Sequence, residues 1–300
     1  MSTIGMIGLG NAGGAVASAL ARHFEVVGFD ADPARRAPAQ ASGVRWAADA
    51  IEVAASGECV LLSLPHPDIS RQVVDTVCSA PATPRLLIET STITPGVARA
   101  LGERCAQAGI GFVDAAIAGG VQAMAAGRNT FLVGGAPEHV AHARTVLDRI
   151  AERVFELGPV GAGSGAKVVN NAVMHALMVV LIEAAAMARK LDIAMPTLIE
   201  VLSRADGLMR PLEHRVAERM VAGDYAGGMS VHNARKDSML ALATAQDLGV
   251  PLFAILAAHT PYEIAEQTGM GDQDYAALAR LWEQWCQVRF DAPSAATDAH

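Results

Sequence analysis

A chain of 300 residues, 52% hydrophobic and only 4% aromatic, can form two domains whose cores consist mainly of Ala, Val and Leu. The net charge of -8 is spread along the chain without a Lys/Arg block, which argues against nucleic acid or an anionic membrane as partner and leaves small metabolites open. The four cysteines form no CxxC and the N-terminus lacks signal-peptide features, so we expect reduced thiols and a cytoplasmic protein. No metal is predicted, because His139 and His142 are the only closely spaced histidines and no further ligand completes a site.

The first predicted element is a β-strand that ends in a glycine turn. The apolar run Thr3 to Leu9 leads into Gly8-Leu9-Gly10-Asn11-Ala12-Gly13, which has GxGxxG spacing and opens an amphipathic helix. A second strand, from Glu25 to Asp30, follows and ends in a carboxylate. Strand, glycine turn, helix and acidic strand end together predict a dinucleotide-binding unit whose turn holds the pyrophosphate.

Asp30 is the residue that bears on cofactor choice. Its carboxylate is expected to accept hydrogen bonds from the adenosine ribose hydroxyls and to repel a 2′-phosphate, which favours NAD over NADP. The alternative is that Arg35 or Arg36 reaches back to a 2′-phosphate.

Two further strands are predicted at Cys59 to Leu64 and Arg85 to Glu89, each followed by a loop and a helix. Such junctions lie at the carboxyl edge of a parallel sheet, where ligands bind. Leu64, Pro65 and Thr92 are therefore predicted to line the cofactor cleft. The alternative for Thr92 is a helix cap, the role we expect for nearby Thr94.

Strand and helix patterns alternate up to about residue 160, and only helical patterns follow. The remaining strands are expected at 112–115, 130–133 and 154–157. The fold class is thus an α/β Rossmann-type, doubly wound parallel sheet followed by an all-α C-terminal domain. The predicted limits are 1–162 for the dinucleotide-binding domain, 163–290 for the helical substrate and oligomerisation domain with its linking helix 163–191, and 291–300 for a disordered tail.

The linking helix places a lysine in an apolar environment. The segment from Val168 to Lys190 has no Pro or Gly and is apolar on nearly every face, which predicts a buried helix, too rich in Asn, His and Glu to span a membrane. Lys167 and Asn171 are four residues apart, so both can reach a small ligand at the helix start. The alternative is that Lys167 merely extends to water.

Four motifs, in order, resemble those of the β-hydroxyacid dehydrogenase family, which includes 3-hydroxyisobutyrate dehydrogenase and tartronate semialdehyde reductase. They are the glycine turn, Glu89-Thr-Ser-Thr92, Gly161-x-Gly163-x-x-x-Lys167-x-x-x-Asn171 with Glu183-Ala184, and Lys236-Asp237 with Gly269-Met-Gly271-Asp272-Gln-Asp274. The resemblance covers nearly the whole chain. It implies a catalytic Lys167, a substrate-orienting Asn171, Lys236 near nicotinamide and substrate, and homodimers or homotetramers.

The substrate loop departs from the family pattern. The family reads Asp-Ala-Pro-Val-Ser-Gly-Gly where this chain has Asp114-Ala-Ala116-Ile-Ala118-Gly119-Gly120. The serine hydroxyl that would help hold the substrate carboxylate is missing at Ala118, although the N–H groups of Gly119 and Gly120 can still donate. His232 and Arg210 are candidate replacement anchors, against an ordinary surface or interhelical role. Met229 stands where the family commonly has an aromatic residue, seven positions before Lys236, and we interpret this as an exchange that the core tolerates.

The predicted reaction is NAD(P)-dependent oxidation of a small 3-hydroxy acid to its semialdehyde, or the reverse reduction. Lys167 would take the hydroxyl proton, which requires a pKa well below about 10.4. Burial and the positive charges of the nicotinamide and Lys236 would both lower it. The alternatives are an imine-reducing or decarboxylating enzyme with an atypical substrate, and a non-catalytic nicotinamide-binding protein.

Overall fold

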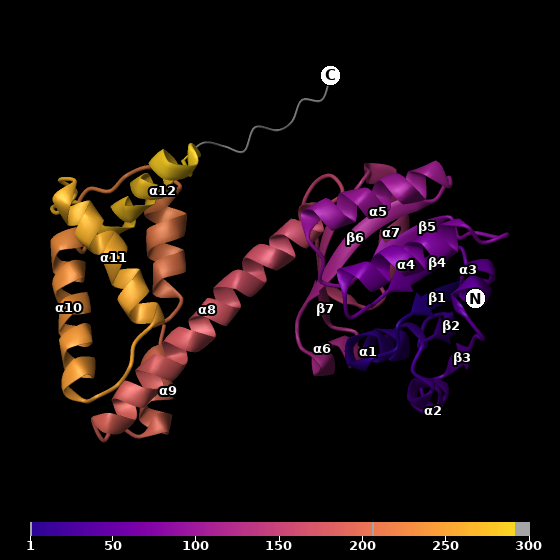
Figure 1. The fold of residues 1–300 in the computed structure, drawn as a ribbon, viewed down its shortest axis with the longest axis horizontal. Helices are drawn as coiled ribbons and strands as arrows, with labels where there is room; N and C mark the ends of the chain where they lie inside the picture. Colours follow the sequence, from indigo (N-terminus) through magenta and orange to yellow (C-terminus); the bar gives the residue numbers. More distant parts are fainter. Residues whose placement is uncertain (1, 206, 292–300) are drawn as a thin grey trace. The chain divides into compact units, whose positions relative to one another are not determined.

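The computed structural model describes residues 2–205 and 207–291, and the chain divides into two compact units, Met1–Val173 and Met174–His300 (Figure 1). The division falls within the long helix that was predicted to link two domains, and the predicted limits of 1–162 and 163–290 stay a prediction. Except for Asp291, the tail predicted to be disordered lies outside the described residues.

The first unit is built on an eight-stranded sheet with the order β3-β2-β1-β4-β5-β6-β7-β8. Its strands are β1 Thr3–Ile7, β2 Glu25–Phe29, β3 Val44–Trp46, β4 Cys59–Leu62, β5 Leu86–Glu89, β6 Gly111–Ala118, β7 Asn129–Gly135 and β8 Ala151–Glu156. All neighbours pair in parallel except β6 and β7, which are antiparallel. The predicted doubly wound parallel sheet is confirmed as a mostly parallel one, while the short strand β3 and the reversal of β7 were not predicted.

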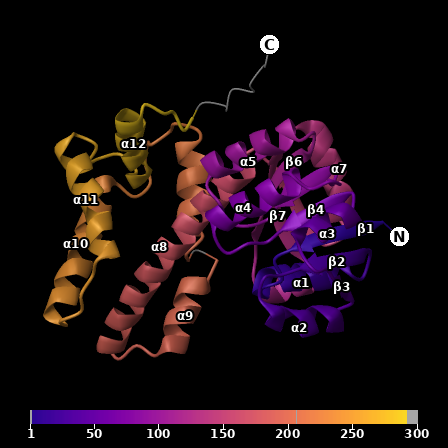
Figure 2. The ribbon, with the colours of Figure 1, turned by 45° about the vertical axis from the view of Figure 1, so that its right-hand side comes forward.

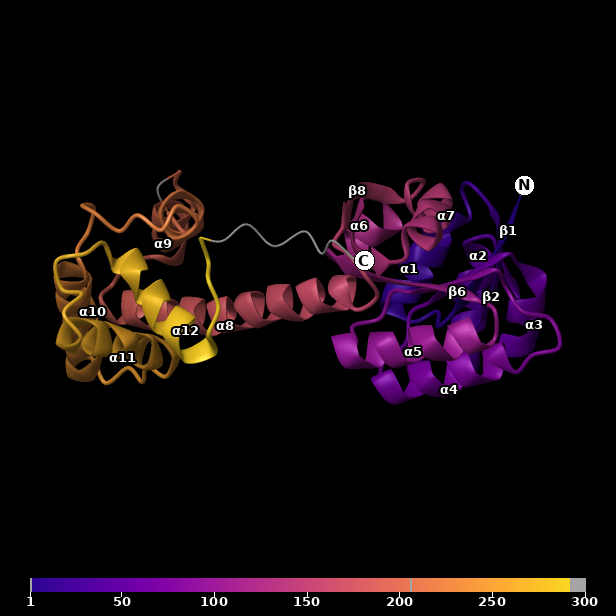
Figure 3. The same ribbon diagram turned by 90° about the horizontal axis from the view of Figure 1, so that it is seen from above.

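Helices cover both faces of this sheet, so its central strands are apolar on both sides. They are α1 Asn11–Leu20, α2 Arg36–Ala41, α3 Ala50–Ser56, α4 Pro67–Cys78, α5 Pro95–Gln107, α6 Val121–Ala125 and α7 Pro137–Leu147. Figure 3 shows α4 and α5 on one side and α6 and α7 on the other. In β1, Met6 belongs to the core under α1, α6 and α7, and the next residue, Ile7, to the core under α3, α4 and α5. This two-residue alternation is typical of a strand.

The second unit is helical, as predicted. Its elements are most of α8 Ala162–Lys190, then α9 Met195–Ser203, the π-helix η2 Pro211–Met220, α10 Val231–Asp247, α11 Ala254–Gln267, the 3-10 turn η3 Tyr275–Leu278 and α12 Ala279–Cys286. Helices α10 and α11 lie side by side (Figure 2). The buried Glu183 of α8 accepts hydrogen bonds from the backbone N–H groups of Phe253, Ala254 and Ile255 at 2.6, 2.9 and 3.0 Å. One carboxylate therefore fixes the start of α11 to α8.

The prediction that the helix over 168–190 is buried is wrong for the single chain. Val169 is 65% exposed, and Met178 and Ile182 are each 56% exposed. Apolar residues on every face predict burial only if some surface covers each face, and the described residues of one chain do not cover them all.

Among the described residues, α8 is also the one helix long and apolar enough to cross a membrane by length and composition. Helices that are covered by other protein segments can be equally long and equally apolar. The polar side chains of Lys167, Asn171 and Glu183 on α8 favour a protein environment.

Candidate active site

The turn between β1 and α1 approaches the end of β4 so closely that glycine is required at two positions. Gly8 has a φ of +92°, and a Cβ there would lie 2.2 Å from the carbonyl oxygen of Ser63. A Cβ at Gly13 would lie 2.0 Å from the carbonyl oxygen of Gly8. Gly10 faces open space instead, since a Cβ there would have no neighbouring atom within 4 Å. The turn is thus fixed on its protein side and open where a pyrophosphate would bind.

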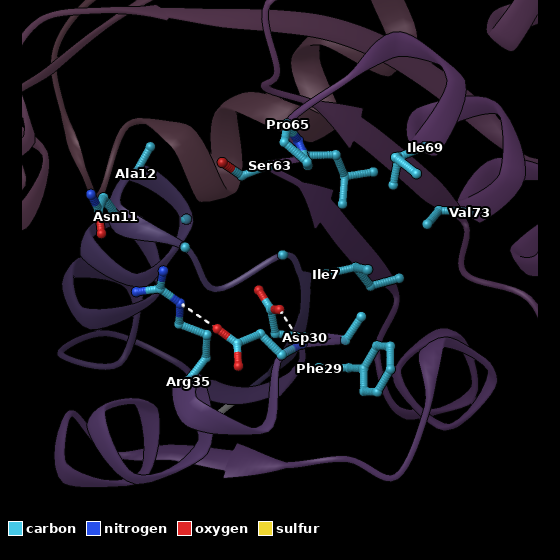
Figure 4. Close-up of a pocket in the computed structure, with 16 residues that line it drawn as sticks. Ile7, Asn11, Ala12, Phe29, Asp30, Arg35, Ser63, Pro65, Ile69 and Val73 are labelled. Atoms are coloured by element: carbon cyan, nitrogen blue, oxygen red, sulfur yellow. Dashed lines mark hydrogen bonds and ion pairs between the residues drawn. The ribbon is translucent and has the colours of Figure 1, made fainter.

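A pocket of about 520 Å³ opens beside this turn (Figure 4). Of the predicted cofactor residues, its walls contain Gly8, Gly10, Asn11, Ala12, Gly13, Asp30, Leu64 and Pro65. Leu9 and Thr92 do not line it. Leu9 is buried with 4% exposure, and Thr92 is exposed in the loop after β5. Thr94 caps α5, since its hydroxyl accepts a hydrogen bond from the N–H of Val97 at 3.3 Å.

The walls also contain residues that the sequence did not single out. They are Ile7, Phe29, Ala31, Asp32, Ser63, Ile69 and Val73. Most of them are sequence neighbours of a predicted wall residue at the end of a strand. They could therefore have been predicted from the ends of the predicted strands.

Backbone donors hold the Asp30 carboxylate at the pocket wall. One oxygen accepts from the Leu9 N–H at 2.6 Å and the other from the Asp32 N–H at 2.8 Å. Each carboxylate oxygen keeps a further acceptor position for a ribose hydroxyl. Arg35 lines the same pocket, with its Nε 3.4 Å from Oδ2 of Asp32 (Figure 4), whereas Arg36 is exposed and does not line it.

A short chain of hydrogen bonds, one part-buried and one buried, fixes the wall at Leu64. The Leu64 N–H donates to the Ser91 hydroxyl at 2.7 Å, and the Ser91 N–H donates to Oε1 of Glu89 at 2.8 Å. Burial raises the pKa of Glu89, against the hydrogen bonds from Ser91, which lower it. The motif Glu89-Thr-Ser-Thr92 thus shapes the pocket through Ser91 and Leu64, with Glu89 as their buried support.

Asp114 of β6 caps the start of α8. Its two oxygens accept from the N–H groups of Gly161 and Ser164 at 2.8 and 2.6 Å. A Cβ at Gly163 would lie 2.2 Å from the carbonyl oxygen of Leu132, so the helix start rests directly on the sheet. The position of the next helical turn, which carries Lys167, is therefore fixed to β6 and β7.

Lys167 and Asn171 lie on one face of α8, one turn apart, and both are half-buried. Burial lowers the pKa of Lys167. Asn171 accepts a hydrogen bond from the side chain of Asn170 at 3.3 Å, and its amide nitrogen can donate to a ligand. The pair combines a lysine that releases its proton more readily than usual with a neutral donor.

The predicted substrate loop lies at the end of β6, four to six residues after Asp114. Ala118 ends the strand, and Gly119, at a φ of +147°, and Gly120 are exposed with no atom within 4 Å of an added Cβ. Open space around these two residues allows a ligand to reach their N–H groups. Ala116 is buried, at 1% exposure, and adds nothing to this surface.

Three candidate residues belong to the helical unit. Lys236 is exposed on α10 with its Nζ 3.2 Å from Asp237, and its expected place near the nicotinamide stays a prediction. Nδ1 of His232 lies 3.2 Å from Oε1 of Glu266. Arg210 lines a pocket other than the one beside the glycine turn. Among the described residues, no group of three or more His, Cys, Asp or Glu side chains is arranged to hold a metal ion.

Known proteins resemble both halves of the chain. Residues 3–158 match the NAD binding domain of 6-phosphogluconate dehydrogenase, and residues 161–282 match the NAD-binding family of NADP-dependent 3-hydroxyisobutyrate dehydrogenase. The chain is 32% identical to 3-hydroxyisobutyrate dehydrogenase of Pseudomonas aeruginosa, over 94% of this chain and 99% of the relative. It is 30% identical to 2-(hydroxymethyl)glutarate dehydrogenase of Eubacterium barkeri, over 95% and 96% of the two chains.

A solved structure gives the same result. The 3-hydroxyisobutyrate dehydrogenase of Mycobacterium tuberculosis, determined with L-serine, is 30% identical and covers 94% of this chain and 99% of its own, with a TM-score of 0.64.

Proposed function

Because the chain belongs to the 3-hydroxyisobutyrate dehydrogenase family and is an NAD(P)-dependent hydroxyacid dehydrogenase, we propose that Lys167 is its general base and Asn171 orients its substrate. The observation that carries this assignment is the position of both side chains on one face of a helix whose start is capped by Asp114.

The reaction proposed is oxidation of a small 3-hydroxy acid to its semialdehyde, and the reverse reduction. The pocket at Gly8 to Gly13 and Asp30 would hold the nicotinamide cofactor, which would supply the hydride acceptor for the hydroxyl-bearing carbon. Lys167, as the neutral amine, takes the proton of the substrate hydroxyl. The C–O bond of the substrate becomes the aldehyde carbonyl. In the reverse direction, the Lys167 ammonium returns the proton to the carbonyl oxygen. Asn171 holds the substrate without adding a charge beside the lysine.

The substrate carboxylate is proposed to bind at the end of β6. The N–H groups of the exposed residues Gly119 and Gly120 are proposed as its donors, since Ala118 offers no hydroxyl. Relatives are named for 3-hydroxyisobutyrate and 2-(hydroxymethyl)glutarate, two acids that carry a hydroxymethyl group beside a carboxylate. We propose a compact acid of this kind as the substrate.

NAD is the proposed cofactor. The Asp30 carboxylate is held at the pocket wall by two backbone N–H groups, where a 2′-phosphate would meet its charge. Arg35 is drawn to Asp32 on the same wall, which reduces its freedom to bind that phosphate. The protein is further proposed to be a homodimer or homotetramer, because the apolar faces of α8 require a covering surface. A cytoplasmic location is proposed on the four cysteines alone, which form no CxxC.

The test is cofactor reduction, followed by absorbance, with NAD and with NADP across a panel of 3-hydroxy acids. We expect activity with NAD on one compact acid and a loss of kcat of about a hundredfold or more in Lys167→Ala. Lys190→Ala, an exposed change at the far end of the same helix, is the control and should keep wild-type activity. Wild-type turnover by Lys167→Ala would refute the assignment, and carbon dioxide release or turnover of cyclic imines would identify a different reaction.

A further inference from the structure

The helical unit contains a pocket of about 830 Å³ whose walls are rich in arginine. Its charged and titratable wall residues are Arg204, Arg210, His214, Arg215, Glu218, Arg219 and Tyr275. The chain as a whole carries a net charge of -8, so this gathering of four arginines is not an average sample of its surface. A positively charged concave surface attracts anions.

The buried Asp274 holds two of these arginines in place. Its carboxylate is 0% exposed and lies 3.3 Å from Nε of Arg215 and 3.6 Å from Nε of Arg219. The same carboxylate accepts hydrogen bonds from the N–H groups of Met229 at 3.1 Å and Ala276 at 2.9 Å. One negative charge thus faces two positive ones, and the arginine pair keeps an excess positive charge.

The guanidinium groups of this pair are oriented without using all their donors. Arg215 stacks over the ring of Tyr275, with its Cζ 4.7 Å from the ring centroid. Arg219 donates a hydrogen bond from Nη1 to the carbonyl oxygen of Ala226 at 2.7 Å. A guanidinium has five N–H donors, so others stay available on each group. Planar groups held in this way suit the two-point binding of carboxylate or phosphate oxygens.

The backbone around the pocket is specialised as well. Gly228 has a φ of +72°, and a Cβ there would lie 2.1 Å from Oδ2 of Asp274, so only glycine allows the chain to pass this close. Arg215 and Arg219 both lie on η2, which is a π-helix. Such helices are rare and frequently occur at functional sites. The pocket is therefore built from several elements rather than from one surface segment.

From this arrangement we propose that the arginine pocket binds a small molecule through a carboxylate or phosphate group. All its described residues belong to the second unit, whereas the turn proposed to bind the cofactor pyrophosphate belongs to the first. The only acidic residue on its described walls, Glu218, lies 3.1 Å from His214. Binding at this pocket requires no turnover, so the proposal can fail or succeed independently of the catalytic assignment.

Isothermal titration calorimetry of the full chain with inorganic phosphate and with glutarate tests it. We expect saturable binding of at least one anion, weakened about tenfold or more in Arg204→Gln and in Arg219→Gln, as for the loss of one charge-assisted hydrogen bond. Arg189→Gln removes the same charge from an exposed site on α8 outside the pocket and should leave the affinity unchanged. Arg204 is exposed and contacts the Val201 carbonyl, so its variant stays informative if Arg219→Gln, which releases the buried Asp274, does not fold.

The anionic group that binds in the pocket can belong either to the substrate or to a separate ligand. Steady-state kinetics distinguish these two cases. If it is part of the substrate, Arg204→Gln raises KM for 2-(hydroxymethyl)glutarate more than for 3-hydroxyisobutyrate. If it belongs to a separate ligand, phosphate changes the wild-type rate with both acids and has no effect on Arg204→Gln. The proposal is overturned if neither anion binds the wild type saturably, or if Arg189→Gln weakens binding as much as the pocket variants.

Discussion

Lys167 acquires its chemical character from its position near the start of α8. The side chain is half-buried, and burial disfavours the ammonium, so its pKa lies below the usual 10.5. Within the described residues it makes no hydrogen bond or ion pair that would stabilise the charge. A lysine in this state can exchange a proton with a substrate hydroxyl.

The pH dependence of both reaction directions should report this pKa. Oxidation needs the neutral amine, so kcat/KM rises with pH and levels off above the lowered pKa, while reduction needs the ammonium and declines over the same range. In Lys167→Arg the guanidinium stays protonated, so the rise should vanish and kcat should fall by about a hundredfold or more. Lys190→Arg should keep the wild-type profile. An unchanged profile in Lys167→Arg would assign the titration to another group.

The first turn of α8 depends on a single carboxylate from the sheet. Asp114 joins β6 to backbone groups 47 and 50 residues later in the chain, and it is completely buried. Lys167 lies only three residues after Ser164, so the cap also fixes the turn of α8 that carries Lys167. A shift of the helix start would therefore move the lysine.

Asp114→Ala should therefore lower stability and catalysis together. Two buried N–H groups lose their acceptors, which we expect to reduce the free energy of unfolding by about 2 kcal/mol or more. We also expect kcat to fall while the dissociation constant for NAD, measured by fluorescence titration, stays close to wild type, because the glycine turn is untouched.

Asp49→Ala is the matched control for this change. Asp49 caps α3 by accepting from the Glu52 N–H at 2.8 Å, away from α8. Its loss should cost about 0.5–2 kcal/mol of stability and leave kcat intact. If both variants lost kcat in proportion to their stability, Asp114 would have no role beyond folding.

Glu183 performs a similar task in the second unit. Burial alone would raise its pKa, but the three N–H donors at the start of α11 outweigh burial and lower the pKa from the ordinary 4.5. A carboxyl whose folded pKa is lowered contributes stability above its unfolded pKa, and this contribution is lost as the pH falls through the folded value. The link between α8 and α11 should accordingly weaken in acid below about pH 4.5.

Hydrogen exchange can measure that link directly. In Glu183→Ala the N–H groups of Phe253, Ala254 and Ile255 lose their acceptor, so their exchange at neutral pH should speed up relative to wild type. The variant should also lose the acid-dependent part of its stability. Glu200→Gln, at an exposed position of α9, should change neither property. Unaltered protection of α11 in Glu183→Ala would refute the capping role.

The parts of the fold that could be predicted from the sequence are those with local signals. The glycine turn, the carboxylate of Asp30 and the apolar strands lie within short segments whose pattern indicates their structure. Strand β3 was missed because Val44–Trp46 is too short for a pattern, and the direction of β7 depends on how it pairs with β6. The cap of α8 by Asp114 joins distant residues, which spacing alone cannot reveal.

The exposure of α8 was also beyond the sequence, because burial depends on what surrounds a helix and not only on its own residues. Val169, Met178 and Ile182 are each more than half exposed in the single chain. Large apolar surfaces of this kind mark sites where proteins associate. The self-association through α8 that we propose would account for both the all-round apolar pattern and the exposure.

Light scattering after size exclusion tests this explanation. The wild type should show a multiple of the mass of one chain, and Met178→Glu/Ile182→Glu should shift it to the single-chain mass, because two buried charges would face an apolar partner surface. Arg189→Glu, at the exposed polar end of the same helix, alters the charge without changing an exposed apolar residue of α8 and should keep the wild-type mass. A wild type that elutes as one chain, or a double variant that keeps the larger mass, would place the covering surface of α8 elsewhere than in a second copy.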